Sequence, residues 1–138
     1  MKKYIVDTNC LLAYFTDRIA EQTEKISIFI EEASNLSVEL YITPIVITEV
    51  VYTLESVYEV KPAEIRDMVE ALIGTPGIIH HEIHPVDVLL ELWPERIKDY
   101  GDAVIAGCGR ILDVPVLTFD RHFSKQMSAN NIANILLK

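Results

Sequence analysis

The sequence contains only two cysteines, Cys10 and Cys108, among its 138 residues. Two thiols provide neither a disulfide framework nor the closely spaced ligands of a zinc site. Glycine and proline are also scarce, at five and six residues, while half of all residues are hydrophobic. This composition excludes collagen-like, low-complexity and disordered chains. We therefore expect one domain over residues 1–138, with a single hydrophobic core.

Long apolar runs are absent as well. No stretch approaches the roughly 18 residues that a membrane-spanning helix requires. The basic start at Lys2 and Lys3 leads into an apolar run that stops at Asp7 after three residues, whereas a signal peptide needs a much longer one. We expect a soluble cytoplasmic protein that does not bind a membrane.

Basic residues are few, since 12 Lys and Arg face 21 Asp and Glu, a formal net charge of -9. This balance argues against a protein that binds duplex nucleic acid mainly through a basic surface. It leaves open a metal-dependent enzyme that acts on nucleic acid, because a divalent cation can supply positive charge at the reacting phosphate.

Short apolar runs alternate with segments of helical periodicity along the chain. We expect strands at residues 4–6, 40–42, 78–83, 116–118 and 135–137. We expect helices at residues 8–15 and 18–34, after Thr43, Pro62 and Pro85, and at residues 102–112. Strands that alternate with helices predict an α/β fold around a mostly parallel sheet.

Periodic apolar residues also predict the buried face of each helix. In the helix at residues 18–34 they are Ile19, Ile26, Phe29, Ile30 and Ala33. In the helix after Pro85 they are Val86, Leu89, Leu90 and Trp93, with Pro94 ending or kinking the helix. In the helix at residues 102–112 they are Val104, Ile105, Cys108, Ile111 and Leu112.

Two aspartates fall at the expected ligand-binding edge of this sheet, outside the carboxyl ends of its strands. Asp7 ends the first strand, and Asp120 follows the strand that ends at Thr118. Both also have a purely structural interpretation, because an aspartate in this position can cap the helix that follows it.

Two further acids lie near helix starts, Glu49 in the second turn after Pro44 and Asp102 at the head of its helix. With 100° per residue, Asp102 lies about 60° from Ile105, and Glu49 has the same relation to Val46. Both therefore border a buried face. The structural interpretation is a favourable dipole interaction for Asp102 and a solvated charge for Glu49.

Four convergent carboxylates favour a metal site over four unrelated structural roles. Two like charges about 4 Å apart repel by roughly 1 kcal/mol in water and roughly 4 kcal/mol at an effective dielectric of 20. A bound cation removes this repulsion, and carboxylate ligands without a His or Cys cluster suit Mg²⁺ or Mn²⁺. Such ions promote attack of water on a phosphoryl group, which predicts phosphodiester hydrolysis.

Four segments, in this order and spacing, resemble the PIN-domain nucleases, which include the VapC-type toxin ribonucleases of toxin–antitoxin pairs. They are residues 5–9 (IVDTN), 47–50 (ITEV), 101–106 (GDAVIA) and 117–123 (LTFDRHF). The resemblance covers essentially the whole chain. It implies a PIN-like three-layer α/β/α sandwich, dependence on Mg²⁺ or Mn²⁺, and single-stranded RNA as substrate.

The matching positions assign roles to particular residues. They make Asp7, Glu49, Asp102 and Asp120 the catalytic, metal-binding acids. Supporting polar positions fall on Asn9 and Thr118, and Asp99 is a further candidate near the cluster. The implied function is a metal-dependent endoribonuclease, the toxin of a pair with an antitoxin protein as partner. Two alternatives stay open: a catalytically weak PIN scaffold that binds a partner protein or RNA, and an RNA-processing nuclease outside toxin–antitoxin systems.

Basic and aromatic side chains complete the set of candidates. Candidate contacts to RNA phosphate, with solvated surface charge as the alternative, are Arg18, Arg121, His122 and Lys125. Apolar helical surface near Tyr14, Tyr52 or Tyr58 predicts a homodimer or an antitoxin-binding face, with ordinary core packing as the alternative. Cys10 and Cys108 are expected to be small core residues.

Overall fold

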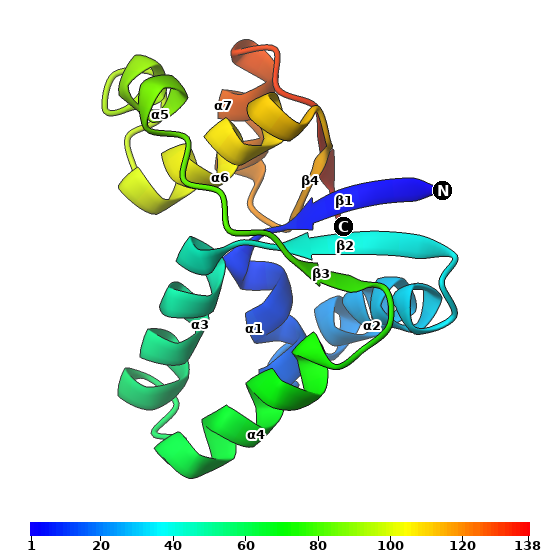
Figure 1. Ribbon diagram of the computed structural model, residues 1–138. Helices are drawn as coiled ribbons and strands as arrows, with labels where there is room; N and C mark the ends of the chain where they lie inside the picture. The colour runs from blue at the N-terminus through cyan, green and yellow to red at the C-terminus, as the bar shows by residue number, and fades with distance from the viewer.

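A five-stranded parallel sheet runs through the middle of the computed structural model, which describes residues 1–138 (Figure 1). The strands are β1 Lys2–Val6, β2 Val38–Ile42, β3 Ile78–His80, β4 Val116–Thr118 and β5 Asn134–Leu136. Their order is β3-β2-β1-β4-β5, and every neighbouring pair is parallel. The predicted sheet is confirmed. β3 is shorter than predicted because its only neighbour, β2, ends at Ile42.

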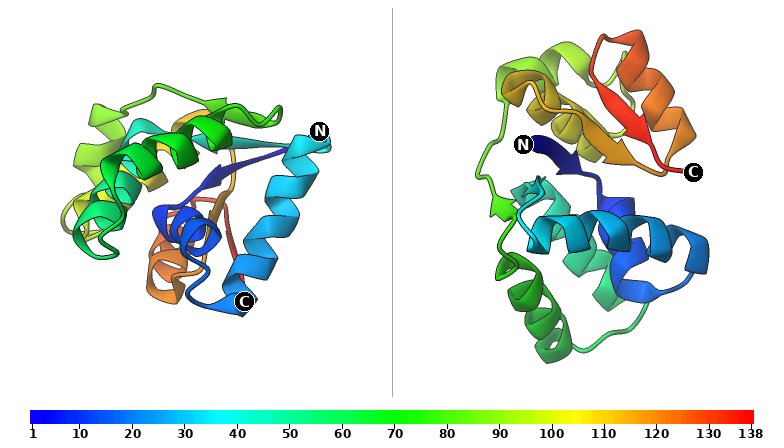
Figure 2. Two further views of the ribbon diagram at one scale, coloured as in Figure 1. Left: turned by 90° about the horizontal axis from the view of Figure 1, so that it is seen from below. Right: turned by 90° about the vertical axis from the view of Figure 1, so that its right-hand side faces the viewer.

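Seven helices cover the two faces of the sheet (Figures 1 and 2). Four lie below the sheet in Figure 1: α1 Thr8–Thr16, α2 Ala20–Ser34, α3 Pro44–Ser56 and α4 Pro62–Ile73. Three lie above it: α5 Val86–Leu92, α6 Tyr100–Leu112 and α7 Arg121–Ala129. The chain adds β1, β2 and β3 towards one edge of the sheet, then returns past β1 and adds β4 and β5 towards the other edge. With right-handed crossovers, this reversal places the helices of the two halves on opposite faces of the sheet. The three-layer α/β/α sandwich is therefore confirmed.

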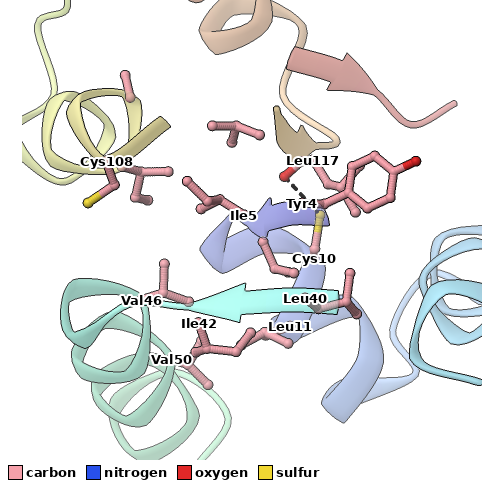
Figure 3. Close-up of a cluster of buried hydrophobic side chains, with 14 of the residues drawn as sticks. Tyr4, Ile5, Cys10, Leu11, Leu40, Ile42, Val46, Val50, Cys108 and Leu117 are labelled. Carbon is pink, nitrogen blue, oxygen red and sulfur yellow. Dashed lines mark hydrogen bonds between the residues drawn. The ribbon is translucent and has the colours of Figure 1, made fainter. Parts of the chain in front are cut away.

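The core fills the space between the sheet and both helical layers (Figure 3). Central strand residues such as Ile5 and Leu117 are fully buried. Cys10 of α1 and Cys108 of α6 are buried free thiols, as predicted. The Cys10 thiol donates a hydrogen bond to the Leu117 carbonyl at 3.5 Å, and burial raises the pKa of both thiols. Neither thiol is therefore placed for nucleophilic chemistry.

Five apolar residues predicted to face inward are exposed instead: Ile19, Val86, Leu90, Trp93 and Ile111. Ile19 is the residue that precedes α2. The two-turn helix α5 buries only Leu89 and Leu92, which leaves the other side of the helix in water. Ile111 lies in the last turn of α6, where only part of the helix is covered.

The remaining differences concern helix boundaries. α7 was not among the predicted helices, because its buried face has just Phe123 and Met127. α5 ends at Leu92, close to the break predicted at Pro94. None of the seven helices is both long enough and apolar enough to cross a membrane.

Candidate active site

The predicted acidic residues line one cavity of about 380 Å³. Asp7 follows β1, Asp120 follows β4, and α3 and α6 contribute Glu49 and Asp102. From the neighbouring strands β1 and β4 the chain proceeds in opposite directions, to β2 and to β5. Such a switch point is the usual place for a ligand in an open α/β sheet. The other lining residues are Thr8, Asn9, Leu12, Tyr52, Thr53 and Asp99.

Asp7 is only 3 % exposed and is held by two hydrogen bonds. Its Oδ1 accepts the backbone N–H of Thr8 at 2.8 Å, so it caps α1 as the structural interpretation predicted. Its Oδ2 accepts the Thr118 hydroxyl at 2.7 Å. Burial nevertheless raises the pKa of Asp7 to about 6, and the charges of Glu49 and Asp120 add to this effect. The cap and the site role therefore coincide in one residue.

Thr118 and Asn9 join the ends of β1 and β4, which fits their predicted supporting role. The Thr118 hydroxyl, besides donating to Asp7, accepts the backbone N–H of Asp120 at 3.0 Å. It also accepts the Asn9 amide at 3.4 Å, while Asn9 Oδ1 accepts the Phe119 N–H at 3.3 Å. These bonds fix the backbone that follows β4, and thereby the position of Asp120.

Asp120 is exposed at the rim of the cavity. Its Oδ1 accepts the backbone N–H of Phe123 at 3.1 Å, so it caps α7. As with Asp7, the predicted cap and the predicted place in the acidic cluster are both found.

Glu49 is held by a contact that the sequence did not predict. Its Oε1 accepts the Thr8 hydroxyl at 2.6 Å, which ties α3 to α1. Its Oε2 lies where a Cβ on Gly101 would be, so only glycine lets α6 approach this carboxylate without displacing it. The glycine before Asp102 was the sequence signal for this close approach.

Asp102 is half-buried in the first turn of α6. Burial raises its pKa to about 8, and the charges of Asp7, Asp99, Asp120 and Glu49 add to the shift. Asp99 caps α6, because its Oδ1 accepts the Asp102 N–H at 2.9 Å. The helix thus begins at Tyr100, earlier than the predicted 102, and Asp99 does line the cavity.

The cavity contains no cation of the protein. No Lys, Arg or His lines it, and none of its carboxylates forms an ion pair. Carboxylate, hydroxyl and amide oxygens are the ligands that Mg²⁺ and Mn²⁺ prefer, so the donor set fits such an ion. In the present side-chain conformations no three acidic residues are arranged to hold one ion. Binding would therefore require carboxylates such as Glu49 or Asp102 to rotate.

The predicted RNA contacts divide into two groups. Arg18 lies beside the acidic cavity, in a smaller cavity that shares Asn9 and Leu12 with it. In contrast, α7 carries Arg121, His122 and Lys125 as exposed side chains, and none of them lines the acidic cavity.

Residues 4–126 match the family model of the PIN domain. The chain belongs to the PIN-domain family. Among solved structures, this PIN domain is similar to VapBC2 from Rickettsia felis bound to a DNA fragment from their promoter. That similarity has a TM-score of 0.70 and 15% identity and covers 99% of both chains.

Two further structures share the fold of this PIN domain. VapBC-1 from nontypeable Haemophilus influenzae matches with a TM-score of 0.67 and 14% identity over 97% of both chains. FitAcB from Neisseria gonorrhoeae matches with a TM-score of 0.62 and 13% identity over 96% of both chains. None of the curated proteins matches the sequence.

Proposed function

We propose that this PIN domain is an endoribonuclease that hydrolyses phosphodiester bonds of single-stranded RNA with Mg²⁺ or Mn²⁺. One observation carries the proposal: five carboxylates, contributed by four separate parts of the chain, line one cavity that contains no protein cation. Burying charge without a partner is costly. A site of this kind is therefore expected where an external cation completes it.

Asp7, Glu49, Asp102 and Asp120 would hold the ion. When bound, the ion supplies positive charge to the phosphate and lowers the pKa of a bound water. The protein itself holds one of these carboxylates in a fixed position and leaves another free to rotate. Asp7 is fixed by Thr8 and Thr118, whereas Asp102 forms no side-chain hydrogen bond that would prevent its rotation.

We further propose that the protein is a cytoplasmic VapC-type toxin controlled by an antitoxin protein. Two observations support this role. The motifs around Asp7, Glu49, Asp102 and Asp120 resemble that group, and structures of VapBC complexes share the fold over nearly the whole chain.

The predicted homodimer is kept as a proposal with a narrower surface. Tyr52 lines the acidic cavity and Tyr58 the smaller one, whereas Tyr14 lies with Phe15 in a separate cavity between α1 and α4. The dimer would use the surface around Tyr14 and Phe15. Light scattering at micromolar concentration should give a dimer, and a monomer would contradict this proposal.

The test of the enzymatic proposal is cleavage of end-labelled single-stranded RNA with Mn²⁺ and with EDTA. Wild-type protein should cleave only with the metal, Asp102→Asn should not cleave, and Glu55→Gln should cleave normally. Cleavage that survives EDTA would contradict the proposal, and no cleavage by any variant would favour the scaffold alternative. Growth arrest of a bacterial host by wild type but not by Asp102→Asn would support a toxin over an RNA-processing enzyme.

A further inference from the structure

A second cavity of about 170 Å³ adjoins the acidic one. The two share Asn9 and Leu12, which lie about one turn apart on α1. A ligand that extends along this side of α1 would therefore pass from one cavity into the other. The remaining walls of the second cavity are Ala13, Thr16, Arg18, Ile19, Gln22 and Tyr58.

Arg18 is the only cation among the residues that line the two cavities. It forms no ion pair, although several carboxylates lie in the neighbouring cavity. Instead its Nη1 donates a hydrogen bond to the Tyr58 hydroxyl at 3.2 Å. A neutral partner orients the guanidinium without neutralising it, so the charge stays available for an anion.

The other walls offer the surfaces that a nucleobase requires. Tyr58 provides an aromatic ring. Ile19 provides an apolar side chain that is exposed and not packed into the core. Gln22 adds an amide that can both donate and accept a hydrogen bond. Unpaired bases are recognised by stacking on aromatic or guanidinium groups and by hydrogen bonds to their edges.

We propose that this cavity binds one nucleotide of the RNA, next to the phosphate that is cleaved. In this arrangement Arg18 binds the nucleotide's phosphate, Tyr58 and Ile19 pack against its base, and Gln22 reads the base edge. The inference rests on the proposed nuclease function and makes it more specific. It also predicts that the exposed cations of α7 contribute less than Arg18, because none of them lines either cavity.

Steady-state cleavage of single-stranded RNA tests the phosphate contact. Arg18→Gln should raise KM about tenfold, the effect of one charge-assisted contact, while kcat changes less than about twofold. The slope of log KM against log salt should fall by about 0.7, as expected when one phosphate contact is lost. The matched control is Arg66→Gln, an exposed arginine of α4 away from both cavities, which should leave KM and the salt slope unchanged.

Cleavage of a random-sequence RNA pool tests base recognition. Wild-type protein should prefer one base at a single position near the cut, and Gln22→Ala should weaken that preference. Tyr58→Ala should raise KM about tenfold through lost stacking, whereas Tyr58→Phe keeps the ring and should raise it less. If the melting curve shows that Tyr58→Ala is unfolded, Tyr58→Phe and Gln22→Ala still test base recognition by the subsite. Wild-type KM, salt slope and base preference in all variants would overturn the subsite.

Failure of the subsite can be distinguished from failure of the nuclease proposal. If wild-type protein does not cleave RNA with Mn²⁺, the nuclease proposal fails, and binding becomes the test of the subsite. Fluorescence anisotropy of a labelled oligouridine in EDTA should then show weaker binding by Arg18→Gln than by wild type and Arg66→Gln. No binding by wild type, or equal binding by all three proteins, would overturn the subsite as well.

Discussion

Helix α3 separates two hollows that differ in how their charges are compensated. One face of the helix contributes Glu49 to the acidic cavity, and the other contributes Glu55 to a groove between α3 and α4. In the groove, Arg66 pairs with Glu70 at 3.2 Å, and both side chains are largely in water. In the acidic cavity no carboxylate has a cationic partner.

The groove is the larger hollow, at about 490 Å³ against about 380 Å³, yet nothing in it requires a further partner. Its charges are paired or hydrated, and such surface pairs contribute little to stability. In the acidic cavity, burial raises the pKa of Asp7 and Asp102. Carboxylates without a cationic partner, more than size, are therefore the reason for proposing the acidic cavity as the functional site.

The largest expected difference between the acidic cavity and the groove is in catalysis. Loss of a group that only supports a metal ligand commonly costs 10- to 100-fold in activity. Asp102→Asn removes a proposed ligand itself, so kcat/KM for RNA should fall by about 100-fold or more. Glu55→Gln in the groove should change it by less than about twofold. Equal activities of the two variants would contradict the assignment of catalysis to the acidic cavity.

The second difference is in the pH dependence of stability without metal. The pKa of Asp7 is about 6 in the folded protein and near 3.9 when unfolded, so the folded state binds more protons. Asp7 therefore contributes most to stability at acid pH, and this contribution falls by up to about 3 kcal/mol as pH rises from about 4 to 6. The raised pKa of Asp102 extends the fall towards pH 8.

Asp7→Asn should flatten this profile, because asparagine keeps the cap and carries no charge. Urea unfolding in EDTA at pH 5 and pH 8 measures the effect, with the mutant as stable as wild type or more so at pH 8. Mn²⁺ should raise the melting temperature of wild type and raise that of the mutant much less. Equal shifts by Mn²⁺ would show that Asp7 is only a helix cap.

A pair of glycines extends the comparison to the backbone. A Cβ on Gly77, at the start of β3, would overlap the carbonyl oxygens of Ala33 and Val38, so Gly77→Ala should lower the free energy of unfolding by about 2 kcal/mol. A Cβ on Gly101 would meet only side-chain atoms, the carboxylate end of Glu49 and, at 3.3 Å, Oδ1 of Asp99. Gly101→Ala should therefore change stability by less than about 1 kcal/mol while reducing RNA cleavage about tenfold. Loss of stability in Gly101→Ala comparable to Gly77→Ala would contradict this assignment.

The smallest effect is expected at Thr118. Thr118→Val removes the hydroxyl that donates to Asp7, which should raise the pKa of Asp7 further. The variant should lose about 1 kcal/mol of stability, and lose more at pH 8 than at pH 5, because the ionised carboxylate depends most on the bond. Denaturant unfolding at the two pH values checks the sign. A loss independent of pH would point to packing alone.

Sequence reasoning succeeded where a local rule determines the outcome. Parallel strands bring Asp7 and Asp120 to the same edge, and helical spacing placed Glu49 and Asp102 beside the buried residues Val46 and Ile105. The same arithmetic failed at Ile111 and Leu90, because periodicity gives a direction around the helix axis but not where the covering elements end.

Contacts between distant elements were also beyond the sequence. The Thr8 hydroxyl meets Glu49, and Tyr58 meets Arg18, only because α1 and α3 lie side by side. No spacing along the chain encodes such pairs. The start of α6 was missed for a local reason. Aspartate is favourable both as a helix cap and in the first turn, and the structure has Asp99 as the cap, with its Oδ1 accepting the Asp102 N–H.

The central claim is that the acidic cavity is completed by a divalent cation, and calorimetric titration with Mn²⁺ tests it most directly. Because the pKa of Asp102 is about 8 without metal, ligation at pH 7 should displace about one proton, and fewer protons at pH 9. Titrations in two buffers of different ionisation enthalpy count them. Wild type and Glu55→Gln should bind Mn²⁺ with this proton release, and Asp102→Asn should bind it weakly without release. Absence of Mn²⁺ binding by wild type, or unchanged binding and proton release by Asp102→Asn, would contradict the claim.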